Sequence, residues 1–298
     1  MRILRRSVRL LALVAALVIG LAVLAYLDTG RRLAAEWRVE PEPLALPAPD
    51  PELLARGAHV ARIRGCRECH GDDLGGGVVI EDWVVGRVVA PNLTAGRGGV
   101  GPLGVSDLLR AIRHGVGRDG RTLLVMPSFE YYHLSDADLA ALIVWIRGRP
   151  PVDRDPGERA LALPIRLLLA LQRDTDFLAA EKVDHDAPRR PAPEPGPTAA
   201  YGAYLALSCE GCHGADFAGG PIPGRPPDWP PAADLTPSGR LAAWDLEDFR
   251  RTLRTGTTPE GRVLPPEYMP WPAFAAMTDE ETEALWRFLH TLSADGRS

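Results

Sequence analysis

The chain has 298 residues, enough for two domains of ordinary size. Apolar residues make up 46% and charged residues 24% of it, a composition that excludes wholesale disorder. The net charge is −5 and there is no basic stripe beyond the first ten residues, which excludes nucleic acid as the main partner.

The N-terminal segment, residues 1–28, is predicted to be a membrane anchor. Four arginines within the first nine residues precede the apolar run Leu10–Leu27. These 18 residues would span about 27 Å as a helix, close to the thickness of a bilayer core. Because the arginines favour the cytoplasmic side, the rest of the chain is expected on the periplasmic, extracytoplasmic side. The alternative is a secretory signal that is cleaved after export.

Further along the chain, two motifs of the form Cys-x-x-Cys-His account for all four cysteines. The motif residues are Cys66, Cys69 and His70 in the first half, and Cys209, Cys212 and His213 in the second. This pattern is typical of c-type haem attachment. The two thiols become thioethers to the porphyrin, and the histidine lies beneath the iron as an axial ligand. The sequence therefore predicts two covalently bound haem c groups.

Two other uses of paired cysteines fit less well. A zinc ribbon does not need a histidine after each pair and usually places its pairs closer together. A thioredoxin-like redox pair lies at the junction of a strand and a helix, and no such pattern surrounds either motif.

Both motifs lie within an internal repeat. Arg56-Gly-Ala-His before the first motif matches Tyr201-Gly-Ala-Tyr before the second, and Asn92-Leu-Thr94 matches Asp234-Leu-Thr236. The repeat divides the chain into five parts. They are the anchor at 1–28, a proline-rich spacer at 29–50, a first domain at 51–151, a linker at 152–197 and a second domain at 198–298.

Methionine supplies the second axial ligand in this prediction. Met126 and Met269 occupy equivalent places in the two repeats, and each precedes a proline. A thioether opposite histidine is typical of electron-transfer cytochromes and raises the reduction potential. Met277 aligns with Leu134 and is expected in the core. In the first domain, His133 is the alternative axial ligand.

The segments between these residues are predicted to be helical, and no alternating strands are evident, which indicates an all-α protein. Ser135 and Thr278 are expected to cap equivalent helices. Shorter helices are expected from Ser106 to Gly115 and from Asp245 to Gly256, and others over 51–64 and 198–207. The apolar stretch Leu161–Ala170 in the linker is expected to pack between the two domains; the alternative is that it touches the membrane or a partner.

The chain resembles the class I cytochrome c superfamily, and more narrowly the multi-haem cytochrome c subunits of membrane-bound alcohol and gluconate dehydrogenases. The matching residues include Pro91-Asn-Leu-Thr94, Ser106, Arg110, Gly115, Asp119-Gly-Arg121, Met126-Pro127 and Leu134-Ser-Asp136. The resemblance implies two tandem cytochrome c domains, each with its own Cys-Cys-His-Met set. The chain departs from those subunits, which typically carry three domains, and it has Asp234 in place of the asparagine of the Asn-Leu-Thr motif.

The expected function is electron transfer rather than catalysis. A filled sixth position leaves no need for substrate at the iron, so the haems would pass electrons from a membrane dehydrogenase or quinol-oxidising complex to a downstream cytochrome or terminal oxidase of a respiratory chain. The alternative is a di-haem peroxidase-type enzyme, which needs an iron with a displaceable distal ligand.

Overall fold

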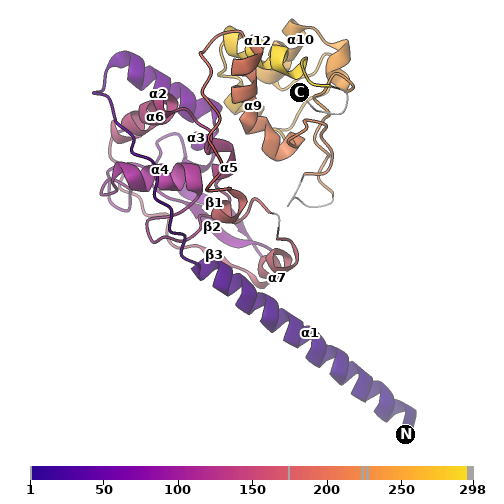
Figure 1. Cartoon of the computed structure of the whole chain (residues 1–298). Helices are drawn as coiled ribbons and strands as arrows, with labels where there is room; N and C mark the ends of the chain where they lie inside the picture. Colours follow the sequence, from indigo (N-terminus) through magenta and orange to yellow (C-terminus); the bar gives the residue numbers. More distant parts are fainter. Residues whose placement is uncertain (1, 174, 223–224, 226–227, 294–298) are drawn as a thin grey trace.

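The computed structural model describes residues 2–173, 175–222, 225 and 228–293. Residue 1 of the expected anchor and residues 294–298 of the expected second domain lie outside this range. Helix α1 (Arg2–Ala34) projects away from a folded body in which the first half of the chain lies beside the second (Figure 1). This helix is long and apolar enough to cross a membrane.

The first half is built around two crossing helices. Helix α2 (Pro51–Ile63) packs on α6 (Asp136–Arg147), and between them in sequence lie α3 (Cys66–His70), α4 (Val105–His114) and α5 (Ser128–Tyr131). Gly57 allows the close crossing, because a Cβ atom there would overlap the carbonyl oxygen of Ala141.

The second half repeats this arrangement. Helix α9 (Ala199–His213) packs on α12 (Asp279–Leu289), with the 3-10 helix η1 (Arg240–Ala243), α10 (Leu246–Thr255) and α11 (Trp271–Phe274) between them. Gly202 lies at the position equivalent to Gly57, and a Cβ atom there would overlap Ala284. The same glycine therefore permits the same helix crossing in both halves.

Most helix ends follow the predicted caps. The side chains of Ser135, Asp245 and Thr278 each accept a hydrogen bond from the backbone N–H three residues later. The helix expected from Ser106 begins one residue earlier, at Val105, with Gly104 as its N-cap, and the N–H of Gly104 donates to the carboxylate of Asp107. Met277 and Leu134 are both in the core, as expected.

The chain is mainly helical, as the all-α prediction requires, but the first half also contains a small antiparallel sheet of order β1-β2-β3. Its strands are β1 (Gly77–Asp82), β2 (Gly86–Ala90) and β3 (Ala160–Leu161). Strands β1 and β2 are rich in valine, which favours extended backbone. The carboxylate of Asp82 accepts from the N–H groups of Val84 and Val85 and so forms the turn.

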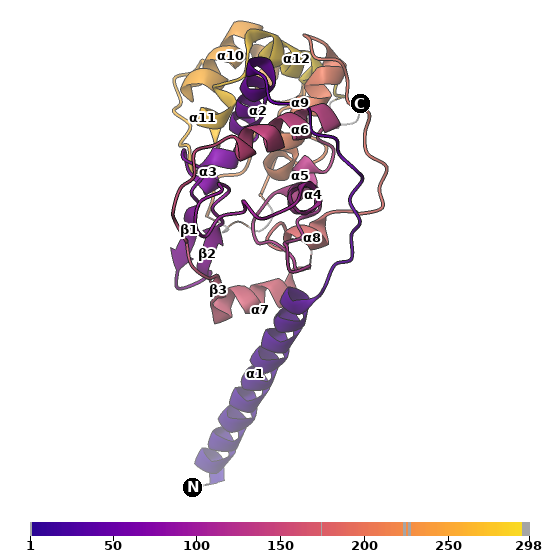
Figure 2. The ribbon, with the colours of Figure 1, turned by 90° about the vertical axis from the view of Figure 1, so that its left-hand side faces the viewer.

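The linker also differs from expectation. Helix α7 (Leu163–Leu171) does not pack between the domains but lies against the body end of α1 (Figure 2). Thr29 donates to the carbonyl of Arg166, and Arg32 donates to that of Leu169 and pairs with Glu181, which lies in α8 (Ala179–Lys182). Arg32 and Thr29 are buried by these contacts. Only Ile165 and Leu169 of α7 are buried, and the helix packs against α1 rather than between the domains.

Candidate functional site

The first cysteine motif forms the short helix α3. Gly65 precedes it with φ 68° and Gly71 follows it with φ 78°, so left-handed glycines separate this turn from the chain on both sides. Cys66 is half-buried and packs against the core, whereas Cys69 is exposed. Cys69 is therefore the more accessible of the two thiols.

The second motif forms the last turn of the long helix α9. Ser208 stands where the first half has Gly65, and the helix continues through it without a break. Cys209 and Cys212 are both half-buried, and Gly214 ends the helix with φ 80°. None of the four cysteines is paired in a disulfide. Burial raises the pKa of Cys66 and of Cys209 to about 12, so both are protonated at neutral pH.

The two motif histidines have the same environment. His70 Nδ1 lies 2.9 Å from the carbonyl oxygen of Pro91, and His213 Nδ1 lies 2.8 Å from that of Ala233. Because a carbonyl only accepts, Nδ1 must carry the proton, which leaves the Nε2 lone pair of a neutral ring available. Burial lowers the pKa of both histidines, which also favours the neutral ring.

This donor set fits a haem iron. A metal-binding histidine characteristically donates its second ring N–H to a carbonyl, which orients the ring and increases the basicity of the ligating nitrogen. Unpaired thiols at the preceding cysteines are the form needed for thioether attachment. The donor chemistry fits in both halves.

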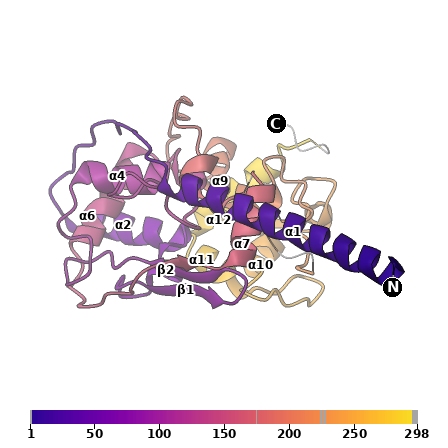
Figure 3. The same cartoon turned by 90° about the horizontal axis from the view of Figure 1, so that it is seen from below.

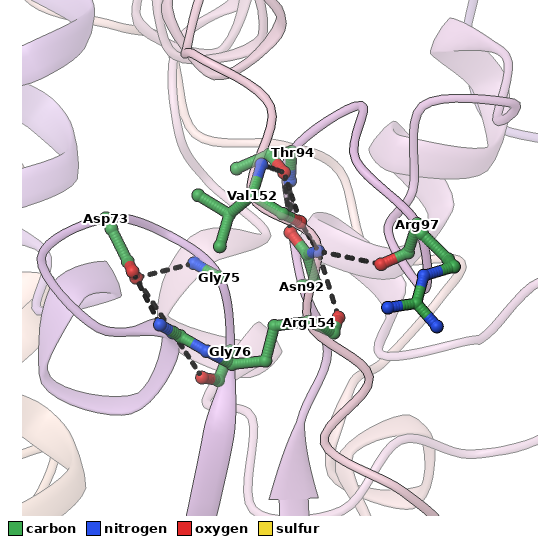
Figure 4. A network of polar contacts seen from close by, with 8 residues as sticks. All are labelled: Asp73, Gly75, Gly76, Asn92, Thr94, Arg97, Val152 and Arg154. Carbon is green, nitrogen blue, oxygen red and sulfur yellow. Dashed lines mark hydrogen bonds and ion pairs between the residues drawn. The ribbon is translucent and has the colours of Figure 1, made fainter.

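Behind His70, the Asn92 side chain holds the loop that carries Pro91 (Figure 4). Asn92 Nδ2 donates to the carbonyls of Val152 at 2.6 Å and Arg154 at 3.1 Å, and its Oδ1 accepts from Thr94 N and Oγ1. Asn92 is fully buried. The chain after α6 is thereby fixed to the loop that orients His70.

Met126 and Met269 begin loops of matching conformation. Each is followed by a proline that caps a short helix, with φ −81° and ψ 57° at Pro127 and φ −77° and ψ 51° at Pro270. Both methionine side chains are half-buried and pack against the core. Tyr131, in the helix after Met126, donates to the carbonyl of Arg64 at 2.6 Å and so connects this loop to the start of the first motif.

The two sites adjoin across the domain interface, which the sequence patterns did not indicate. Arg64 is buried and donates to Ser208 Oγ at 2.7 Å and to the carbonyls of Tyr204 and Leu205. Arg64 precedes Cys66 by two residues, and Ser208 directly precedes Cys209. On the other side, a Cβ atom at Gly211 would meet Glu130 Oε1 at 2.5 Å, so the glycine between Cys209 and Cys212 allows α5 to approach closely.

Other polar groups complete the interface. The hydroxyl of Tyr204 donates to Asp138 Oδ2 at 2.5 Å and accepts from Ser135 N, while His59 Nε2 lies 2.8 Å from Glu281. His133, the alternative ligand, has its Nδ1 accepting from Arg190 N at 3.1 Å. These residues come from distant parts of the chain, and no local motif marks them.

Comparison with known proteins supports this description. Residues 52–146 match the family described as cytochrome c oxidase, cbb3-type, subunit III, and residues 199–293 match the family described as cytochrome c.

Among curated relatives, the cytochrome c subunit of the quinone alcohol dehydrogenase of Gluconacetobacter polyoxogenes is 26% identical over 83% of this chain and 57% of its own length. The gluconate 2-dehydrogenase cytochrome c subunit of Pantoea cypripedii is 28% identical over 83% of this chain and 61% of its own length. The fructose dehydrogenase cytochrome subunit of Gluconobacter japonicus is 29% identical over 44% of this chain and 28% of its own length. The chain thus spans about three fifths of the length of the first two. It belongs to the cytochrome c superfamily and carries one cytochrome c domain in each half.

Proposed function

We propose that this protein is a membrane-anchored di-haem cytochrome c that transfers electrons. The observation that carries the proposal is the repetition of one donor set, Cys-Cys-His-Met, on equivalent elements of the two domains, with the same carbonyl contact to Nδ1 of each histidine. The domains are proposed to cover residues 51–151 and 198–298, with the linker at 152–197.

The proposed roles follow from chemistry. Cys66 and Cys69 attach one haem and Cys209 and Cys212 the other. The axial ligands are His70 and Met126 in the first domain, and His213 and Met269 in the second. Each haem, when bound, supplies an iron that accepts and releases one electron. The carbonyls of Pro91 and Ala233 hold the imidazole rings in orientation. The thioether side chains of the two methionines favour the reduced state of the iron.

The anchor proposal rests on α1. Its apolar run is followed directly by residues 28–34, which pack into the body through Thr29 and Arg32. A helix continuous with the folded body favours retention over cleavage. The arginines before the apolar run favour the cytoplasmic side, so the haem domains are proposed to lie on the periplasmic side.

The proposed partners are the membrane, an electron donor and an electron acceptor. The relatives' names favour a membrane-bound dehydrogenase as donor, with a quinol-oxidising complex as the other possibility. A downstream cytochrome or terminal oxidase would receive the electrons. Purification of the native membrane complex, followed by identification of the co-purifying proteins, tests this assignment.

Redox titration of the full-length protein in detergent tests the ligand assignment. Met126→Leu and Met269→Leu should each lower one of two reduction potentials by a sizeable part of the roughly 0.8 V range that axial ligands control. Met277→Leu is the matched control, because Met277 is a core methionine and the potentials should not change. Two potentials unaffected by the first two variants, or peroxide turnover by a high-spin haem in the unmodified protein, would contradict the proposal.

A further inference from the structure

An apolar surface lies on the side of the body from which α1 emerges. Its side chains come from α7 and from the tip of the β1–β2 hairpin, and we name it the membrane-side platform. It consists of Trp83, Val84, Leu163, Leu168 and Leu171. Trp83 is 81% exposed and Leu171 83% exposed. Large apolar side chains gathered on one exposed surface indicate a contact with an apolar partner.

The two parts of the platform form one unit. Ala162 N donates to the carbonyl of Val85, and Ile165 N donates to that of Val84, both at 3.0 Å. Helix α7 buries Ile165 and Leu169 toward the body and leaves Leu163, Leu168 and Leu171 facing outward. Figure 3 shows α7 between α1 and the hairpin.

The position of the platform along α1 identifies the surface it would meet. Arg166 lies over the ring of Tyr26 at 4.4 Å, and Arg173 pairs with Asp28 at 3.0 Å. Tyr26 and Asp28 mark the end of the apolar run Leu10–Leu27. Helix α7 therefore lies beside the level at which α1 would leave the hydrocarbon core of a bilayer.

The residue types also suit that level. Tryptophan and tyrosine favour the interface between hydrocarbon and headgroups, and arginine places its charge among the phosphates. Arg31 and Arg173 are exposed, and Arg173, two residues after Leu171, pairs with Asp28 of α1. A short amphipathic helix with these neighbours is typical of an element that lies in the plane of the interface.

We propose that the membrane-side platform inserts into the headgroup region of the bilayer that α1 spans. This inference rests on the proposed membrane anchoring. The occupant is lipid, because the surface is continuous with the spanning helix. The platform gives the body a second point of attachment, so the haem domains are held at a fixed orientation to the membrane.

Lipid quenching of a site-specific fluorophore tests the proposal. All four native cysteines are engaged if both haems are attached, so a single introduced cysteine can be labelled alone. Full-length Trp83→Cys and Leu171→Cys, each carrying bimane, are placed in phosphatidylcholine–phosphatidylglycerol vesicles with and without brominated acyl chains. Leu17→Cys, within the apolar run, and Val263→Cys, 68% exposed in the second domain, are the two controls. The ratio of fluorescence in the two lipids cancels quenching by haem.

Brominated lipid should reduce the fluorescence at positions 83 and 171, as at position 17, and leave position 263 unchanged. Quenching at 17 without quenching at 83 and 171 would overturn the platform while leaving the anchor in place. Absence of quenching at 17 would overturn the anchor, and the platform with it. If 83 and 171 are insensitive both to brominated lipid and to aqueous iodide, protein covers the surface and the lipid assignment is wrong.

Discussion

The two cytochrome c domains share their helix crossing and their donor set but differ in what covers the methionine loop. Before Met126, the chain is paired with linker residues: Val125 N donates to the carbonyl of Phe177 at 2.9 Å, and Ala179 N donates to that of Leu123 at 3.0 Å. Before Met269, Pro265 and Pro266 have no N–H to donate, and Tyr268 is 37% exposed. The repeat thus accounts for the shared helices, whereas the linker, which lies outside the repeat, provides backbone hydrogen bonds to the methionine loop of the first domain.

A second difference concerns the residue behind each histidine. Asn92 donates to carbonyls of the chain after α6, whereas Asp234 is a carboxylate and only accepts, from Thr236 and Ser238. The first domain also has the β1–β2 hairpin where the described part of the second has a single bridge between Gly220 and Ala232. The first domain is therefore tied to its surroundings at more points than the second.

The largest effect is expected at the helix crossings, where the domains are alike. Gly57→Ala and Gly202→Ala should each destabilise their own domain by about 3 kcal/mol, the upper end for overpacking, because the new Cβ meets a backbone carbonyl. Urea denaturation followed by far-UV circular dichroism measures this. Gly77→Ala is the control, since its Cβ would meet nothing within 4 Å. A tolerated alanine at one crossing would show that the two are not equivalent.

Exchanging Asn92 and Asp234, the residues next to the carbonyls that hold the histidines, should affect the stability of the two domains differently. Asn92→Asp should destabilise the first domain by about 3 kcal/mol, because a buried carboxylate replaces the donor to two carbonyls. The reciprocal Asp234→Asn should have little effect, since Oδ1 still accepts from Thr236 and the new amide can donate to the hydroxyl of Ser238. Denaturant midpoints of both variants provide the measurement. Equal losses would mean that the two loops are held in the same way.

Removing the linker contact should loosen only the first methionine loop. Leu178 is fully buried and pairs with Leu124, so Leu178→Ala should destabilise the first domain by about 2.5 kcal/mol. Heating followed by absorption should then show earlier loss of methionine ligation at one haem only. Leu171→Ala, in the same linker but exposed, should leave this temperature unchanged. Earlier loss at both haems would argue that the linker supports the whole body.

The smallest effect is a pH dependence at the domain interface. The hydrogen bond to Glu281 raises the pKa of His59. Burial opposes ionisation of Glu281, but hydrogen bonds from His59 and Thr278 N outweigh it and keep the pKa of Glu281 below its usual value. The stabilisation from His59 is complete below the unfolded pKa of about 6.5 and is lost as pH rises through the raised folded value. That from Glu281 is lost as pH falls through its lowered value.

Replacing His59 tests this dependence. When the pH is raised from about 6 to about 9, the free energy of unfolding of the unmodified protein should fall by up to about 1 kcal/mol more than that of His59→Gln. Thermal unfolding midpoints across this range provide the measurement. His290→Gln is the control, since His290 is exposed and its Nδ1 lies 2.9 Å from the carbonyl oxygen of Trp286 in its own helix. Parallel pH profiles for His59→Gln and the unmodified protein would rule out a role for this pair.

Local signals in the sequence predicted most of the scaffold. Ser135, Asp245 and Thr278 act on backbone groups three residues away, so a short window of sequence contains the whole interaction. The cysteine motifs and the repeated Met-Pro pairs are equally local. The haem ligation that they indicate stays a prediction, whereas their similar surroundings in both halves are observed.

Long-range contacts explain what the sequence did not reveal. The valines of the β1–β2 hairpin favour strands, but they do not alternate with polar residues, and no strand was predicted there. The apolar residues of α7 indicated that the helix packs against another element, but they did not identify that element as α1. Arg64 reaches residues 140 positions away, and nothing beside it in the sequence distinguishes it from other arginines.

Arg64 has an electrostatic consequence for a protein that holds two haems. Burial raises the pKa of Glu130 to about 8, so this nearby carboxyl is mostly protonated at neutral pH and leaves the cation without a compensating charge from it. Oxidation adds a positive charge to a haem, and a fixed cation in a medium of low dielectric disfavours that change. Because Arg64 adjoins both cysteine motifs, it would raise the reduction potentials of both haems. Arg64 would therefore shift both proposed reduction potentials in the same direction.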